Sequence, residues 1–262
     1  MSTGRGGRVL ARALMLATCF FLIAPVLVVV LFAFHSSPRL ALPFEGVSLR
    51  WFEAVFSEEQ FSESLVTSIK VALGVGALAS LIGYFGARAV LSSSRVVRTV
   101  SIAAAAPSIF PPLLISLGCA LLLNRLDWEP GVLPTIVGQT IIAMPFAALI
   151  ILARVRNLDP DLVRASRDLG ASEWTTFRRI TFPLVRGAIL AAGCLAMALS
   201  LDEFIIAFFA GAGSPTVPVT LWGLLRRGVD PSANAIAVVL LALCSALIVV
   251  AIRQLGRDLE RI

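Results

Sequence analysis

Long apolar runs constrain the fold of this chain more than any other feature of its sequence. They occupy residues 10–34, 65–89, 97–123, 134–155, 187–209 and 233–252, each near the ~20 residues that a helix needs to cross a bilayer. A buried strand is much shorter, at roughly 4–8 residues. Inside lipid a helix satisfies its own backbone hydrogen bonds, so the runs predict an all-α polytopic membrane protein with six transmembrane helices. We expect residues 1–262 to form a single transmembrane domain, which excludes the water-soluble classes.

The first run follows Arg5, Arg8 and Arg12, as the apolar segment of a secretory signal peptide would. Its apolar stretch is much longer than the ~7–15 residues of such a segment. No cleavage pattern of small residues follows Phe34. We therefore expect the first run to remain as a membrane span.

The basic residues lie between the apolar runs. A net charge of +6 and a pI of about 10.1 also occur in nucleic-acid-binding proteins, so the position of the charges decides the class. Most of the 22 Lys and Arg residues lie before the first run, between the second and third, between the fourth and fifth, and after the sixth. Basic residues near span ends stay on the cytoplasmic side. This distribution predicts that both termini are cytoplasmic, that lipid surrounds the chain, and that nucleic acid is not a partner.

Prolines interrupt two of the runs. Pro107, Pro111 and Pro112 lie in the third run, and Pro145 lies midway along the fourth. A proline frees backbone groups that lipid cannot satisfy, so these helices are expected to face protein or a watery pathway. A packed kink without a pathway is the alternative.

A polar segment at 156–183 separates the fourth and fifth runs, on the predicted cytoplasmic side. Asp159 is a suitable helix cap, and Pro160 fits the first helical position. Gly170 favours a helix end. Between them, apolar residues recur on one face of the predicted helix: Leu162, Ala165 and Leu169.

A second short helix is predicted from Ser172, with Trp174 and Phe177 on one side. Exposed apolar residues among arginines suit insertion into an acidic-rimmed cleft of a partner. The alternative is a basic amphipathic loop that rests on anionic lipid headgroups.

The segment resembles the cytoplasmic loop of permease subunits of bacterial binding-protein-dependent ABC importers. The pattern of that loop is Glu-Ala-Ala, three residues, Gly, nine residues, Ile-x-Leu-Pro, and four positions match it at the right spacing: Ala165, Gly170, Ile180 and Pro183. Three positions depart from it: Arg164 replaces Glu, Ser166 replaces Ala and Phe182 replaces Leu. From "LDPDLVRASRDLGASEW" onward the chain is similar to the second permease of spermidine/putrescine importers.

The resemblance implies a type I ABC importer permease fold and a bacterial cytoplasmic (inner) membrane location. It implies that the loop 156–183 is a coupling loop that docks into a cytoplasmic ATPase. The residues expected to couple are Leu162, Ala165, Asp168, Leu169, Gly170, Ala171, Trp174, Phe177, Ile180 and Pro183.

The family also implies the partners of the chain. They are a second permease, expected to be a different homologous chain, an ATPase dimer that binds ATP and Mg²⁺, and an extracytoplasmic solute-binding protein. No cofactor is expected on this chain. A polyamine such as spermidine or putrescine is the favoured substrate, with aminophosphonate, thiamine or iron as alternatives.

Two acids lie in the fifth run, where an ionised carboxylate costs about 3 kcal/mol or more unless it is paired or wetted. They are Asp202 and Glu203, followed by Phe204. The family resemblance places this run along the translocation pathway, so all three are candidate pathway residues. Adjacent helical residues point about 100° apart, so we expect one acid at most to face the lumen. A structural hydrogen-bonded pair at the interface of the two permeases is the alternative.

The segment after the fifth run is too apolar for a free loop. Trp222 and its leucine neighbours suggest a short helix that closes an outer gate or receives the binding protein. An interfacial helix anchored by Trp222 is the alternative. The same ambiguity applies to Trp51, Phe52 and Phe56 in the segment after the first run.

The chain lacks the residues of several catalytic sites. Its only lysine, Lys70, follows "VTSI" and not a phosphate-binding glycine loop. Its only histidine, His35, lies at a span end, so no serine protease pair or metal site is expected. We expect no catalytic residue on this chain. A secondary transporter or channel, or a membrane-surface scaffold, would leave the coupling-loop pattern unexplained.

Overall fold

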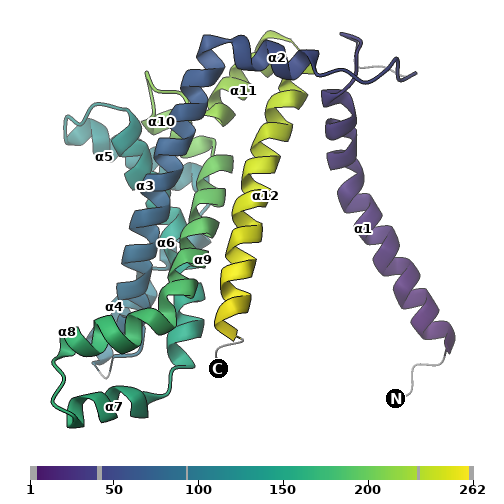
Figure 1. The fold of residues 1–262 in the computed structure, drawn as a ribbon. Helices are drawn as coiled ribbons and strands as arrows, with labels where there is room; N and C mark the ends of the chain where they lie inside the picture. The colour runs from purple at the N-terminus through teal and green to yellow at the C-terminus, as the bar shows by residue number, and fades with distance from the viewer. Residues whose placement is uncertain (1–4, 40–42, 93, 229–230, 260–262) are drawn as a thin grey trace. The chain divides into compact units, whose positions relative to one another are not determined.

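The computed structural model describes residues 5–39, 43–92, 94–228 and 231–259, and these are mostly helical (Figure 1). The long helices are α1 (Arg5–Ala33), α3 (Glu59–Val90), α6 (Val132–Arg156), α9 (Phe182–Asp202) and α12 (Pro231–Leu259). The shorter helices are α2 (Arg50–Ser57), α4 (Arg95–Ala103), α5 (Pro112–Arg125), α7 (Pro160–Asp168), α8 (Glu173–Thr176), α10 (Ile205–Ala210) and α11 (Val217–Arg227). Within the described residues there is no strand, only an isolated antiparallel bridge between His35 and Val47. The predicted all-α class is confirmed.

Among the described residues, five segments are long and apolar enough to cross a membrane, and they overlap five of the six apolar runs. They are Val9–Ala33, Glu59–Val90, Val132–Arg156, Glu173–Asp202 and Pro231–Gly256. The third run does not form one helix. The chain leaves α4 at Ala103, passes through a short 3-10 helix at Ala106–Ile109, and enters α5, which has 14 residues.

Proline chemistry explains the break in the third run. Pro107 lies in the 3-10 helix, and Pro111 and Pro112 lie at the start of α5. None of these residues has a backbone N–H, so a continuous α-helix through them would lose its hydrogen bonds. Pro112 instead opens α5 at the first helical position, where no N–H is needed. The interruption expected from these prolines is confirmed, and the count of six spans stays a prediction.

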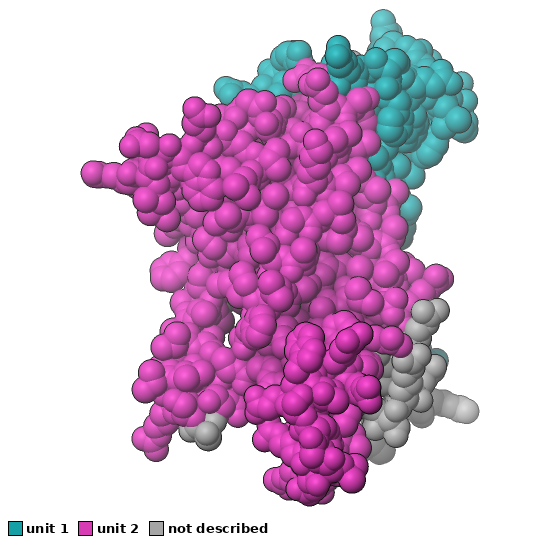
Figure 2. Space-filling model, turned by 60° about the vertical axis from the view of Figure 1, so that its left-hand side comes forward, with its two compact units in different colours: residues 1–59, 221–239 teal, residues 60–220, 240–262 magenta. Residues whose placement is uncertain are grey.

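Two compact units make up the chain (Figure 2). The first comprises Met1–Glu59 and Leu221–Val239, and the second comprises Gln60–Thr220 and Leu240–Ile262. Trp51 fixes the loop after α1 in the first unit, because its indole Nε1 donates to the backbone oxygen of His35 at 2.7 Å. The Arg50 guanidinium lies 4.3 Å from the Trp51 ring centre. Trp51 is therefore buried in its own unit, whereas Phe56 remains exposed.

The second unit has its core between α3, α6 and α9. The fully or nearly fully buried residues of this core are Val71, Val75, Ala79, Tyr84, Ala87, Ala143, Ala147, Ile151, Val185, Ala192 and Ala196. Many are alanines, and small residues allow membrane helices to approach closely. At Gly83 the two backbones approach closely, because a Cβ there would lie 2.9 Å from the backbone nitrogen of Ala148 on α6. Pro145 is also buried, so this turn of α6 faces protein.

Both ends of the second unit carry short helices. In Figure 1, α7 and α8 lie at one end of α3, α6 and α9, while α5 and α10 lie toward the other end. The loop 156–183 is thus separated from Asp202 and Glu203, at the other end of α9, by the length of that helix.

Candidate functional site

Helix α7 of the coupling loop begins as its sequence predicts. Asp159 is the N-cap, and its carboxylate accepts the backbone N–H of Asp161 at 2.9 Å. Pro160 occupies the first turn. Arg164 donates to the Asp161 carboxylate at 2.8 Å within the same helix, and both side chains are about three-quarters exposed. An ion pair this exposed adds little stability, so the Asp159 cap contributes more than the ion pair to the stability of the first turn of α7.

Gly170 ends α7 in a Schellman motif. Its φ is +80°, a conformation that favours glycine. Its N–H donates to the Arg167 carbonyl at 2.9 Å, and the N–H of Ala171 donates to the Ser166 carbonyl at 3.1 Å. A Cβ built at Gly170 would meet nothing within 4 Å, so a side chain would fit there. Glycine is favoured at this position because of its positive φ.

Helix α8 begins at the predicted cap. The Ser172 hydroxyl accepts the N–H of Thr175 at 3.2 Å. A π-helix, Phe177–Thr181, follows and leads directly into α9, and the N–H of Phe182 donates to the Phe177 carbonyl. No pattern in the sequence predicts this π-turn. Pro183 beside it has no N–H, which removes one ordinary helical bond at the junction.

The candidate coupling residues divide into an outer and an inner set. The exposed set is Leu162, Ala165, Asp168, Leu169, Gly170 and Trp174, and the partly buried set is Ala171, Phe177, Ile180 and Pro183. Leu169 is 89% exposed and Trp174 is 68% exposed. These apolar side chains face away from the second unit and are available to another molecule.

Phe177 connects the coupling loop to the core of the second unit. Its ring centre lies 5.9 Å from that of Tyr84 on α3 and 5.6 Å from that of Trp174. Tyr84 is only 7% exposed. Aromatic pairs at this spacing attract each other, so Phe177 serves as an internal anchor and Trp174 as the outer residue of the pair.

Glu203 explains why α9 does not continue to residue 209. Its carboxylate accepts the N–H groups of Ile205, Ile206 and Ala207 at 2.9–3.2 Å, which satisfies the first free donors of α10. The backbone at Glu203 is extended, with φ −77° and ψ 113°. The expectation that Asp202 and Glu203 lie on one continuous helix is therefore wrong, because the capping side chain ends one helix and starts the next.

A buried amide on α6 completes the surroundings of Glu203. Gln139 is 2% exposed, and its Nε2 donates to the Glu203 carboxylate at 3.4 Å. Its Oε1 accepts the hydroxyl of Ser200 at 2.5 Å. The network joins α6, α9 and α10. Gln139 is not among the residues predicted from the sequence, although an amide within an apolar run is a signal of a buried polar contact.

Asp202 has a different environment. It is the last residue of α9 and is exposed, and its carboxylate forms no hydrogen bond or ion pair with the residues that the structure describes. Phe204 is partly buried, and its ring centre lies 5.5 Å from that of Phe208. The two adjacent acids are therefore not equivalent, since one is engaged by its own chain and the other is not.

Helix α11 contains Trp222, as the apolar pattern predicts. The N–H of Val217 at its start donates to the Ser68 hydroxyl of α3 at 2.8 Å, and Ser68 is 3% exposed. Trp222 is 45% exposed. The helix exists as expected, and its role as a gate or an anchor stays a prediction.

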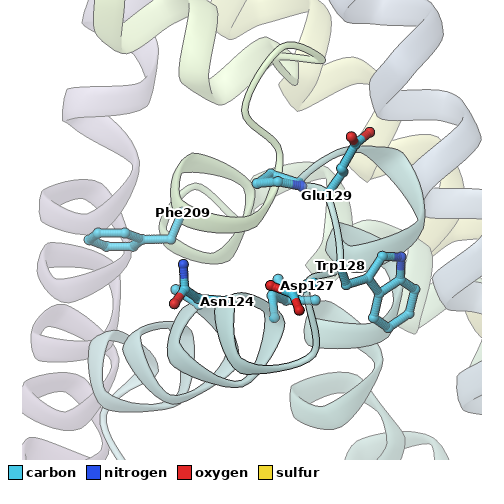
Figure 3. A pocket seen from close by; sticks show the side chains of 8 residues that line it. Asn124, Asp127, Trp128, Glu129 and Phe209 are labelled. Carbon is cyan, nitrogen blue, oxygen red and sulfur yellow. The ribbon is translucent and has the colours of Figure 1, made fainter.

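An open pocket of about 330 Å³ lies between α10 and the turn after α5 (Figure 3). Its lining residues are Ala120, Leu123, Asn124, Asp127, Trp128, Glu129, Pro130 and Phe209. Phe209 and Asn124 lie on one side of the pocket, and Trp128 lies on the other. Carboxylates beside an indole face are groups that attract ammonium cations. The sequence places Asp127 and Glu129 close together after α5 but does not predict the pocket.

Among the described residues, no group of three or more His, Cys, Asp or Glu side chains could hold a metal ion. Cys119, Cys194 and Cys244 are free and partly buried, whereas Cys19 is free and exposed on α1.

Two relatives of known name resemble the chain over most of its length. The putrescine transport system permease protein PotI of Escherichia coli strain K12 is 30% identical over 230 residues, which cover 84% of this chain and 82% of that protein. The spermidine/putrescine transport system permease protein PotC of the same strain is 26% identical over 254 residues, with 96% of each chain covered.

The fold matches that of a solved transporter. A chain of a bacterial ABC transporter involved in the import of the acidic polysaccharide alginate superposes with a TM-score of 0.65 at 15% identity, covering 97% of this chain and 96% of that one. The family described as "Binding-protein-dependent transport system inner membrane component" matches residues 1–261. This chain therefore belongs to that family, and it is a permease of the ABC importer class.

Proposed function

We propose that the chain is the permease subunit of an ATP-driven importer of polyamines, such as putrescine or spermidine, in a bacterial cytoplasmic membrane. One observation carries the choice of substrate: relatives named for putrescine and for spermidine/putrescine transport match 84% and 96% of the chain. Asp202 adds support, because an exposed carboxylate beyond α9 suits a cationic substrate.

The complete importer contains further subunits. A second permease, expected to be a different homologous chain, lines the other half of the pathway. An ATPase dimer supplies the energy and holds ATP and Mg²⁺, so this chain needs no cofactor of its own. The family description, which includes dependence on a binding protein, supports an extracytoplasmic solute-binding protein as the donor of substrate.

The loop 156–183 couples the permease to the ATPase. Its exposed residues Leu162, Leu169 and Trp174 support insertion into a cleft of the ATPase, while Phe177 holds the loop on α3. Closure of the ATPase on ATP moves the loop, and the loop moves α9, which it joins without a break through the π-turn. The pathway then opens outward to receive the substrate.

Asp202 is the pathway carboxylate, and Glu203 is a structural residue. The carboxylate of Glu203 already accepts backbone N–H groups of α10 and the Gln139 amide. Asp202 is exposed, and its carboxylate forms no hydrogen bond or ion pair with a described side chain, so it is available to an ammonium group of the substrate. Phe204, two positions after Asp202, lines the pathway, and Trp222 on α11 is a further candidate pathway residue.

Transport by the reconstituted complex tests the substrate. The chain, the second permease, the ATPase and the binding protein of its own transporter are assembled in proteoliposomes, and uptake of radiolabelled putrescine and spermidine is measured with and without ATP. ATP-dependent uptake of a polyamine is expected. Uptake of thiamine, an aminophosphonate or ferric iron in place of polyamine would refute the substrate, and uptake without ATP would favour a secondary transporter.

A charge substitution tests the pathway acid in the same assay. Asp202→Asn is expected to lower polyamine uptake about tenfold, because a hydrogen bond to a charged group contributes about 1.5–3 kcal/mol. ATP hydrolysis by the assembled complex should persist. Glu63→Gln, which neutralises an exposed acid on α3, serves as the control and should leave uptake unchanged. Equal uptake by wild type and Asp202→Asn would remove Asp202 from the pathway.

A further inference from the structure

We propose that a hydrogen bond between Ser166 and Thr176, here called the clasp, holds α7 and α8 at the relative angle that ATPase binding requires. The inference rests on the proposed coupling role of the loop 156–183 and identifies the contact that gives this loop its shape. Ser166 stands where the family pattern has Ala, so the clasp belongs to this chain and not to the pattern.

The clasp is a buried hydrogen bond between two hydroxyls. The Ser166 Oγ and Thr176 Oγ1 atoms lie 2.9 Å apart, although the residues are separated by ten positions in the sequence. Ser166 is 7% exposed and Thr176 is 4% exposed. Ser166 lies on α7, and Thr176 is the last residue of α8, so the bond spans the junction between the two helices.

Ser166 is bound at two of its atoms. Its backbone carbonyl accepts the N–H of Ala171 at 3.1 Å in the Schellman motif, and its hydroxyl pairs with Thr176. The first contact closes the turn within α7, and the second fixes the direction in which α8 leaves that turn. The other side-chain link between these helices, from Arg167 to Glu173 at 3.0 Å, is largely exposed and is expected to contribute little.

The clasp lies on the inner side of the loop, and the proposed ATPase contacts lie on the outer side. Leu169 and Trp174 are exposed at 89% and 68%, in contrast to the two hydroxyl residues. Their spacing depends on the angle between α7 and α8. A rigid pair of helices loses less conformational freedom on binding than a flexible pair, so the clasp increases affinity for the ATPase without touching it.

Four proteins test the clasp: wild type, Ser166→Ala, Thr176→Val and the double variant. The dissociation constant for the purified ATPase subunit of the same transporter is measured in nanodiscs, and the ATP hydrolysed per solute imported is measured in proteoliposomes. Each single variant leaves one hydroxyl buried without its partner, so we expect about tenfold weaker ATPase binding and more ATP consumed per solute. Because both hydroxyls are then absent, the double variant should bind no more weakly than either single variant.

Matched variants separate the clasp from general damage. Ser116 is 1% exposed and donates to Pro112 within α5, and Thr140 is 4% exposed and donates to Ile136 within α6. Ser116→Ala and Thr140→Val therefore remove equally buried hydroxyls that do not join the coupling helices. Thr176→Ser keeps the hydroxyl but loses a methyl group. Near wild-type ATPase binding is expected for all three.

The results distinguish the clasp from the coupling role itself. Trp174→Ala removes a proposed outer contact and should abolish ATPase binding if the loop is the docking element. If Trp174→Ala binds normally, the coupling role fails and the clasp with it. If Trp174→Ala fails to bind while Ser166→Ala and Thr176→Val match their controls, only the clasp is refuted. The clasp would also be refuted if Thr176→Ser bound the ATPase as weakly as Thr176→Val, because the loss of affinity would then come from packing and not from the hydrogen bond.

Discussion

At the scale of single residues, Glu203 determines where α9 ends and how α10 begins. Its carboxylate is the acceptor for three backbone N–H groups, so Glu203→Ala should lower the free energy of unfolding by about 1–2 kcal/mol, the usual loss for a helix cap. The measurement is the thermal unfolding midpoint of the purified chain in detergent. Asp202→Asn is the control and should leave the midpoint unchanged. If Glu203→Ala and Asp202→Asn had the same unfolding midpoint, the Glu203 cap would not stabilise the junction between α9 and α10.

At the scale of elements, the turn between α7 and α8 depends on a backbone that only glycine adopts readily. Gly170→Pro is incompatible with a φ of +80° and removes the N–H that donates to Arg167. We expect this variant to reach the membrane but no longer to co-purify with the ATPase.

Gly213 provides a matched control for that element. Its φ is +82°, and it lies between α10 and α11, away from the coupling loop. Gly213→Pro introduces the same backbone conflict and should retain the ATPase. If the ATPase were recovered equally with Gly170→Pro and Gly213→Pro, the result would favour a loop 156–183 that rests on the lipid surface, and a secondary transporter.

At the scale of the whole molecule, the number of membrane crossings follows from whether the broken third run crosses. Single cysteines in a cysteine-free background are placed at exposed positions on either side of it, Arg95→Cys on α4 and Glu129→Cys after α5, and Glu173→Cys marks α8. A membrane-impermeant maleimide applied to intact cells should label only Glu129→Cys. The other two positions should label after lysis, in agreement with the basic-residue distribution.

Labelling of Arg95→Cys and Glu129→Cys from the same side would contradict six spans. α5 would then enter the membrane and return on the side from which it came. The short length of α5, 14 residues, makes this experiment necessary, because a full crossing by a single straight helix needs ~20 residues.

Local patterns gave correct predictions wherever neighbouring residues decide the structure. Asp159 and Ser172 cap the two coupling helices, Gly170 ends the first, and the prolines after Ala106 break the third run. Each of these effects operates within about one helical turn, through a missing N–H, a capping oxygen or a permitted φ. The family pattern in the loop is made of the same local features.

The sequence by itself therefore determined the helical class, the apolar runs and the turn at Gly170. Only the tertiary structure decided that Glu203 is engaged by Gln139 of α6, 64 positions away, while Asp202 remains exposed. It also decided that Ser166 bonds Thr176 and that Phe177 packs on Tyr84. The physical reason is that hydrophobic periodicity specifies which face of a helix is buried, whereas a hydrogen bond between helices depends on their relative position to within a fraction of an ångström.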